Sequence, residues 1–349
     1  MKQEHNAFSW KRVLILAGAV IAFQIGSGFA TGQEIIQYYT AYGVEGLLTL
    51  AVFFGTFLYY NVNFAKAGAE EHFEKANDIY RFYCGKYVGT FCDYYSTIFC
   101  YMSFWVMVGG AASTLNQEYG LPLWIGAVIL VALTAITVAG GLEFLVDAIG
   151  LVGPIIVVIC IAIGIITLFR DGGDIQAGLD AIKNGTFEGA KAGETIKNAG
   201  PNWLGIIGGT IAVSVAIALI SFAQIANINT PNADGSIHVW DAAIPNLILA
   251  MKVWKPFSAI FAVIVFAGIY TSAVPLLYNP ASRFAKEGTP KFKILTIVLA
   301  IIGLIVGLFL PFKMLVNYIY VLNGYVGALL IVFMLWKNIK DTFLKKKEA

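Results

Sequence analysis

The chain alternates between long apolar runs and shorter polar segments, which is typical of helices that cross a membrane. A membrane-spanning helix needs about 20 predominantly apolar residues. Nine runs are candidate spans: residues 12–40, 44–64, 88–115, 122–139, 143–169, 203–227, 256–282, 292–311 and 314–336. The polar stretch 228–254 contains an amphipathic piece, 242–251, that is too short to cross. We expect this piece to lie on the membrane face or to cap a vestibule.

Residues 24–34 interrupt the first span in its middle. Gly26, Gly28 and Gly32 weaken the helix there because glycine adopts conformations that other residues resist. In hydrocarbon a broken helix is tolerated only where its freed backbone groups face protein, ions or water. The carbonyls of the first half suit a cation, and the N–H groups of the second half suit a carboxylate. The break therefore predicts a transporter binding site, with a kink that only allows close helix packing as the alternative.

Composition supports a polytopic membrane protein with the lipid bilayer as its partner. Hydrophobic residues make up 58% of the chain and charged residues 13%, and the mean hydropathy is +0.75. The net charge of +2 comes with no basic face outside the loops, so no nucleic-acid partner is expected. No hydrolase or protease motif occurs, so we do not expect an enzyme. Cys84, Cys92, Cys100 and Cys160 are expected to be small buried hydrophobic residues.

Basic residues predict the topology. Four segments are rich in Lys and Arg: residues 2–12, 66–87, 283–293 and 337–347. The positive-inside rule places them in the cytoplasm, so both termini are expected on the cytoplasmic face of the plasma (inner) membrane. That arrangement requires an even number of crossings, whereas nine runs are recognisable.

The mismatch in crossings falls on residues 170–202. Counting spans from the N-terminus puts residue 170 outside, and counting from the C-terminus puts residue 202 inside. The stretch between them is polar and contains no apolar run able to cross. A span is absent there, or one assigned span is re-entrant, or the charge rule fails locally.

Acidic residues within the spans are candidates for function because a charge at membrane depth is costly. Glu34 follows the break directly and could bind a substrate amine, pair with a buried cation or carry a proton. Asp93, Glu143 and Asp147 lie nearer to helix ends, where an interfacial position is expected. Tyr101 is a candidate gate of a vestibule, and a core or lipid-facing position is its alternative.

A second polar feature lies midway through the span 256–282. The hydroxyls of Thr271 and Ser272, together with the carbonyl of Gly268, can supply oxygen ligands to a hard cation without adding charge. The alternative is that the hydroxyls bond back to carbonyls four residues earlier, as is common in membrane helices.

Several sequence motifs carry a resemblance to a known family. They are Gly26-Ser27-Gly28-Phe29-Ala30-Thr31-Gly32-Gln33-Glu34, Tyr38-Tyr39, Tyr42-Gly43, Ile244-Pro245-Asn246, Tyr270-Thr271-Ser272 and Ser282-Arg283-Phe284. The chain resembles the YkvI family of bacterial membrane proteins, in the amino acid/polyamine/organocation superfamily. The resemblance implies an all-α, LeuT-type bundle of two inverted five-helix repeats, the first helix of each repeat being broken.

The resemblance also implies site residues and a function. It implies a sodium site formed by the carbonyls of Gln24, Ile25 and Gly26 with Gly268, Thr271 and Ser272. The N–H groups near Phe29, Ala30 and Thr31 would receive a substrate carboxylate, with Gln33 or Glu34 on polar groups of the substrate. Gln24, Ser27, Gly28 and Tyr101 complete the expected substrate-binding set. The implied activity is secondary transport of amino acids or related small amines by alternating access, with sodium as a candidate coupling ion.

The expected layout departs from that of the family at one helix. Residues 1–169 are the first repeat, 170–202 a polar loop, 203–336 a second repeat and 337–349 a basic cytoplasmic tail. The sixth helix is missing or cryptic, in the interval where the topology conflicts. The chain is then a deletion variant, or Gly205–Gly209 is the break of a displaced sixth helix. A non-transporting membrane protein, either a sensor or an inactive paralogue, is the alternative function.

Overall fold

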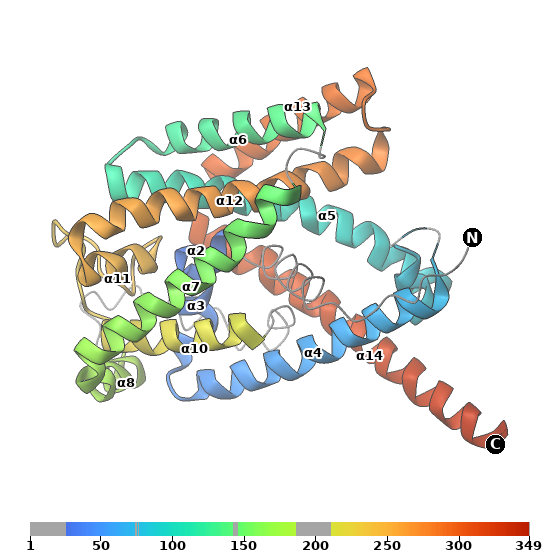
Figure 1. Ribbon diagram of the computed structural model, residues 1–349, viewed down its shortest axis with the longest axis horizontal. Helices are drawn as coiled ribbons and strands as arrows, with labels where there is room; N and C mark the ends of the chain where they lie inside the picture. Colours follow the sequence, from blue (N-terminus) through green and yellow to red (C-terminus); the bar gives the residue numbers. More distant parts are fainter. Residues whose placement is uncertain (1–25, 74, 76, 142–145, 186–210, 349) are drawn as a thin grey trace.

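The computed structural model describes residues 26–73, 75, 77–141, 146–185 and 211–348, which form helices and connections (Figure 1). The helices are α2 (Ser27–Thr31), α3 (Gln33–Tyr38), η1 (Thr40–Tyr42), α4 (Glu45–Glu71), α5 (Asp78–Tyr119), α6 (Leu123–Gly140), α7 (Val146–Asp171), η2 (Gly172–Asp174), α8 (Ile175–Asn184), α10 (Ile211–Ala226), α11 (Pro245–Val253), α12 (Lys255–Phe284), α13 (Pro290–Phe309) and α14 (Phe312–Glu348). Within the described residues there is no strand, which confirms the all-α prediction.

Seven of the described helices are long and apolar enough to cross a membrane: α4, α5, α6, α7, α12, α13 and α14. Each overlaps most of one of the predicted spans. Helix α5 begins ten residues before the predicted span and α14 continues through the predicted tail, so the described part of the tail is helical. The predicted segments 12–25, 203–210 and Gly205–Gly209, and the acid Glu143, lie outside the described residues.

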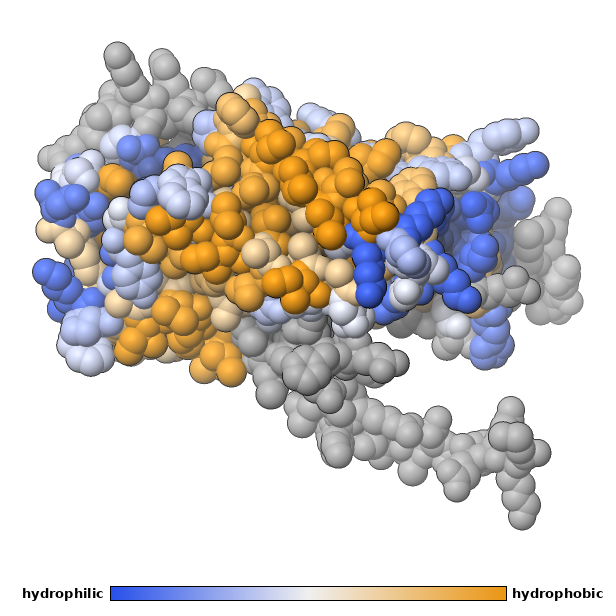
Figure 2. Space-filling view, turned by 90° about the horizontal axis from the view of Figure 1, so that it is seen from above, coloured by the Kyte–Doolittle hydropathy of each residue, from blue (hydrophilic) through white to orange (hydrophobic). Residues whose placement is uncertain are grey.

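The bundle has two polar ends separated by an apolar middle (Figure 2). We call the end that contains residues 227–254 the loop end, and the opposite end, which contains the α12–α13 connection 285–289, the hairpin end. Contacts between helix termini define the loop end: Ser258 of α12 donates to Glu118 of α5 (2.6 Å), and Lys313 of α14 pairs with Asp241 (2.9 Å). The apolar middle is the surface that a bilayer would cover.

Helices α7 and α10 run in the same direction. Gly164 of α7 lies against Leu219 of α10, and both helices end beside Lys252 of α11. Lys252 pairs with Asp171 at the end of α7 (3.1 Å) and donates to Asn227, just after α10. The other long helices alternate in direction along the chain (Figure 1). The connection from α8 to α10, where the predicted topology conflict falls, lies outside the described residues beyond residue 185.

At the hairpin end, α5 bends sharply at Gly85, whose backbone is left-handed (φ 71°). Gly89 allows the short piece before the bend to lie against the rest of the helix, because a side chain there would collide with the backbone of Arg81. The bend brings Arg81 and Asn77 back to Asp93, which also binds Arg283 at the end of α12. The Asp93 carboxylate is therefore buried in an ion cluster at the hairpin end, and its interfacial position stays a prediction.

Close helix contacts fill the core. Gly303 and Gly307 of α13 lie against Phe104 and Val108 of α5, where an added side chain would not fit. Small residues at such contacts let the backbones of membrane helices approach closely. Three of the four cysteines, Cys84, Cys92 and Cys160, are buried as predicted, while Cys100 is half-buried.

Candidate functional site

The predicted break in the first helix lies at Gly32. Helix α2 ends at Thr31 and α3 begins at Gln33, and Gly32 between them is left-handed (φ 81°). The Thr31 hydroxyl donates to the Gly28 carbonyl (3.2 Å) and accepts from the Gln33 N–H (3.2 Å), so it satisfies backbone groups on both sides of the break. The candidate residues Gln24 and Ile25 lie outside the described residues.

Two amide side chains from other helices donate to backbone carbonyls at the break, one of which, that of Gly32, also accepts from the Ile36 N–H (3.0 Å). Gln224 of α10 donates to the Gly32 carbonyl (3.1 Å), and Asn246 of α11 donates to the Ala30 carbonyl (3.3 Å). The Thr40 hydroxyl approaches the Gln224 amide oxygen (2.7 Å) and the Ser221 hydroxyl (3.1 Å). We call Thr40, Ser221, Gln224 and Asn246 the Gln224 cluster. It supplies the polar environment that a broken helix needs inside a membrane protein.

The Gln224 cluster was not predicted as part of the site. Its signal in the sequence is the pair Ser221 and Gln224, three residues apart on one face of an otherwise apolar run. Gln224 is fully buried, and a buried amide must find hydrogen-bond partners. The sequence alone does not show that its partner is the backbone at Gly32.

Helix α11 inserts into the bundle instead of lying on the membrane face. All residues from Pro245 to Ala250 are buried. Gln117 of α5 binds the backbone of Ile244 twice, accepting from its N–H (2.9 Å) and donating to its carbonyl (2.8 Å). Asn246 of this buried segment lies against Gly32, so α11 packs beside the break, and a vestibule that it caps stays a prediction.

Gln33 also connects the break to the loop end. In the amide orientation that satisfies both of its ends, it donates to the carbonyls of Ala242 (2.9 Å) and Ala243 (3.2 Å) and accepts from Gln37 (2.8 Å). Its hydrogen-bonding groups are therefore used within the protein, which leaves Glu34 as the charged candidate of this segment.

Glu34 lies over the start of α2. Its carboxylate is so close to Gly28 that a side chain at that position would collide with it, and the ring of Tyr320 from α14 lies beside the same point. No described Lys, Arg or His forms an ion pair with Glu34. Ser27, the residue before Gly28, is buried and held on α5, where its hydroxyl donates to the Val106 carbonyl (3.4 Å).

The candidate cation ligands of α12 lie on a helix that packs against α2. Thr271 and Ser272 are both buried. The Thr271 hydroxyl donates to the Gly268 carbonyl (2.9 Å), a bond back along its own helix, three residues earlier and not four. Gly26, the remaining described candidate, caps the start of α2, and its carbonyl accepts from the N–H of Ala30 (3.2 Å).

Tyr101 does not bind a group of the break. Its hydroxyl donates to the Leu299 carbonyl of α13 (2.8 Å), and its ring meets Trp105 edge to face. The Tyr101 hydroxyl is therefore bonded to α13 and the residue is half-buried, and a gating role stays a prediction.

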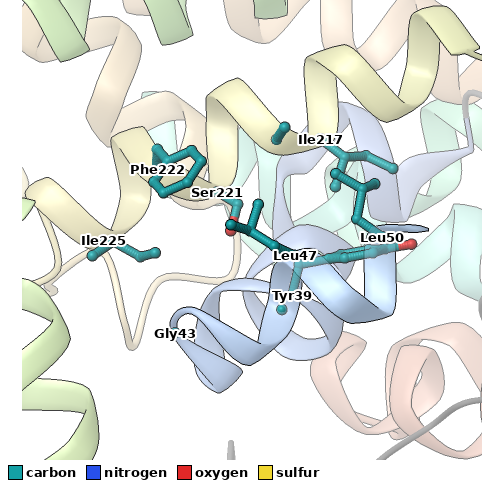
Figure 3. Close-up of a pocket in the computed structure, with 10 residues that line it drawn as sticks. Tyr39, Gly43, Leu47, Leu50, Ile217, Ser221, Phe222 and Ile225 are labelled. Carbon is teal, nitrogen blue, oxygen red and sulfur yellow. The ribbon is translucent and has the colours of Figure 1, made fainter. Parts of the chain in front are cut away.

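A small pocket adjoins the Gln224 cluster, between α10 and the α3–α4 corner (Figure 3). Its wall contains the Ser221 hydroxyl, Tyr39, Gly43 and apolar side chains including Leu47 and Phe222. Of the Gln224 cluster only Ser221 lines this pocket, and Glu34 does not line it. Among the described residues no group of three or more His, Cys, Asp or Glu side chains is placed to hold a metal ion.

Seven of the described helices are long and apolar, and the backbone groups at the helix break form hydrogen bonds within the protein. Together these features indicate an all-α, membrane-embedded protein. No family model, curated protein or solved structure matches the chain.

Proposed function

We propose that this protein is a secondary active transporter of the LeuT type, related to the YkvI family, that moves amino acids or related small amines by alternating access. The observation that carries the proposal is the break at Gly32, whose carbonyls bind side chains of α10 and α11 inside the bundle. Broken helices held in this way form the central sites of secondary transporters.

The helix directions support a ten-crossing scheme. Counting α2 and α3 as one broken crossing, the described helices alternate except for α7 and α10, which both run toward the loop end. One further crossing between them would complete two five-helix repeats. The hairpin end contains the basic residues of 283–293. We therefore propose that this end, with both termini, faces the cytoplasm across the plasma membrane.

Within this site we assign Glu34 to the amine of the substrate. It is the acid nearest to the break, and no described basic side chain neutralises it, so a cationic substrate or a proton would supply the missing charge. The substrate carboxylate would bind near Phe29–Thr31, where the Ala30 N–H is already used by Gly26. Sodium, if it is the coupling ion, would bind between Gly26 and Gly268, Thr271 and Ser272.

The alternative function is a non-transporting sensor or an inactive paralogue. The observation in its favour is that three polar side chains of the candidate sites already have protein partners: Gln224, Asn246 and Thr271 each donate to a backbone carbonyl. A site closed in this way binds a ligand only if these contacts exchange.

Uptake into proteoliposomes tests the proposal. Purified protein is reconstituted and given a labelled amino-acid mixture with and without an inward sodium gradient, and in parallel with a proton gradient. Accumulation above protein-free liposomes supports transport, and we expect Glu34→Gln to lose it. If sodium drives uptake, Thr271→Ala removes the sodium dependence. No uptake under either gradient, from protein shown to be folded, rejects transport in favour of the sensor or inactive paralogue.

A further inference from the structure

Helix α14 carries one exposed apolar stripe along nearly its whole length. Its members recur every three or four residues and therefore lie on one helix face. They are Met314, Tyr318, Leu322, Tyr325, Leu329, Val332, Trp336, Ile339 and Phe343, each 39–68% exposed. The opposite face is anchored in the protein, because Leu330 and Met334 are buried and Asn338 donates to Asn63 (2.6 Å). The stripe therefore faces away from the bundle.

This stripe is longer than a membrane is thick. From Met314 to Phe343 it extends about 44 Å at about 1.5 Å per residue, whereas the hydrocarbon core measures about 30 Å. Tilting a straight helix to hide the whole stripe would need more than about 40°, beyond the range of membrane helices. The last part of the stripe, Trp336 to Phe343, consequently reaches the layer of lipid headgroups or passes it.

The charges around this last part are mainly positive. Lys340 is exposed beside the stripe, and the chain adds Lys345, Lys346 and Lys347 before α14 ends. Lys337 lies over the ring of Phe82 (4.0 Å) and pairs with Asp341 (3.4 Å). Figure 1 shows the end of α14 extending away from the other helices, so no described element covers it.

We propose that residues 336–343 form a binding surface for acidic phospholipids at the membrane face where α14 ends. Trp336, Ile339 and Phe343 enter the boundary between headgroups and acyl chains, and Lys340 contacts lipid phosphates. An apolar helix face with adjoining lysines binds a membrane surface by these two contributions together. Lipid is the occupant that the structure favours, because the stripe continues the lipid-facing surface of α14 without interruption.

The experiment places an environment-sensitive NBD label on the stripe and beside it. The variants Phe343→Cys and Thr342→Cys differ by about 100° around the helix at almost the same depth. Both are reconstituted as the full chain in nanodiscs of phosphatidylcholine alone or with phosphatidylglycerol. Unmutated protein taken through the same labelling measures the background from the native cysteines, of which Cys84, Cys92 and Cys160 are buried.

In discs with phosphatidylglycerol we expect the label at 343 to shift to the blue and to be quenched by nitroxide lipids, with a smaller effect at 342. Lys340→Gln should lower the ratio of inserted to exposed label by roughly fivefold, the effect of one lysine at an acidic surface. Ile339→Cys repeats the measurement if Phe343→Cys fails to fold.

Two results overturn the proposal. One is an NBD label at 343 that iodide in the buffer still quenches, with the same emission and quenching as the label at 342 in both lipid compositions. The other is a blue shift that depends on protein concentration in detergent without lipid, which would show contact with a second copy instead. Because neither readout needs a substrate, this test succeeds or fails independently of the transport assay.

Discussion

The Asp93 cluster at the hairpin end (Asn77, Arg81, Asp93 and Arg283) allows a sharp stability prediction. The Asp93 carboxylate is 2% exposed and accepts from Asn77 (2.7 Å), Arg283 (2.8 Å) and Arg81 (3.2 Å). Asp93→Asn keeps the shape but removes the charge, so Arg283 loses its carboxylate partner and Arg81 keeps only the carboxylate of Asp78. Removing one partner of a buried ion pair costs about 3–5 kcal/mol. Because Arg81 and Arg283 are 41% and 24% exposed, water recovers part of this. We expect a loss of roughly 2–4 kcal/mol.

Thermal unfolding in detergent measures this loss, with a thiol-reactive dye that reports the buried cysteines as they become exposed. For Asp93→Asn we expect a midpoint lower by roughly 5–10 °C. Asp78→Asn is the matched control, because Asp78 pairs with the same Arg81 (2.8 Å) but is 33% exposed. Such a surface pair contributes less than about 1 kcal/mol. If the two variants shift the midpoint equally, burial of the Asp93 cluster does not stabilise the fold and the reasoning is wrong.

Three further predictions concern the break and the topology. Gly32→Ala should destabilise the protein by roughly 2 kcal/mol or more, because alanine resists the left-handed backbone and its side chain would collide with the Asn246 amide of α11. The control Gly55→Ala has open space around it and should not destabilise the protein. Gln224→Leu should cost roughly 1–3 kcal/mol by removing the buried hydrogen bonds of Gln224 to the Gly32 carbonyl and the Thr40 hydroxyl, and an unchanged midpoint would contradict that. Cysteines introduced at Asn184 and Lys291 should react with an impermeant thiol reagent from opposite sides of the membrane, and reaction of both from one side would reject the proposed topology.

The membrane-spanning helices could be predicted because they depend on local composition. An apolar run of about 20 residues needs no knowledge of its neighbours to be recognised. The start of α5 could not be predicted in this way, because its first turns contain Arg81 and other polar residues and precede a sharp bend at Gly85. A hydropathy pattern does not distinguish such a folded-back helix from a loop.

The break was predictable from its glycines and from Glu34, whereas its partners were not. Three glycines in seven residues indicate an interruption, and a carboxylate beside them indicates function. Gln224 and Asn246, by contrast, are far from the break in the sequence, and their contact with it depends on how α10 and α11 pack. The position of Asp93 depends likewise on Arg283, which is 190 residues away.

The burial of α11 has a consequence for the order in which the protein folds. Membrane helices first insert one by one and then associate. Helix α11, with nine residues, is too short to insert by itself, and its buried side chains find their contacts only after α2, α5 and α10 have assembled. It is therefore the last element to dock and the first to detach. Amide hydrogen exchange in α11 should be faster than in the helices that enclose it.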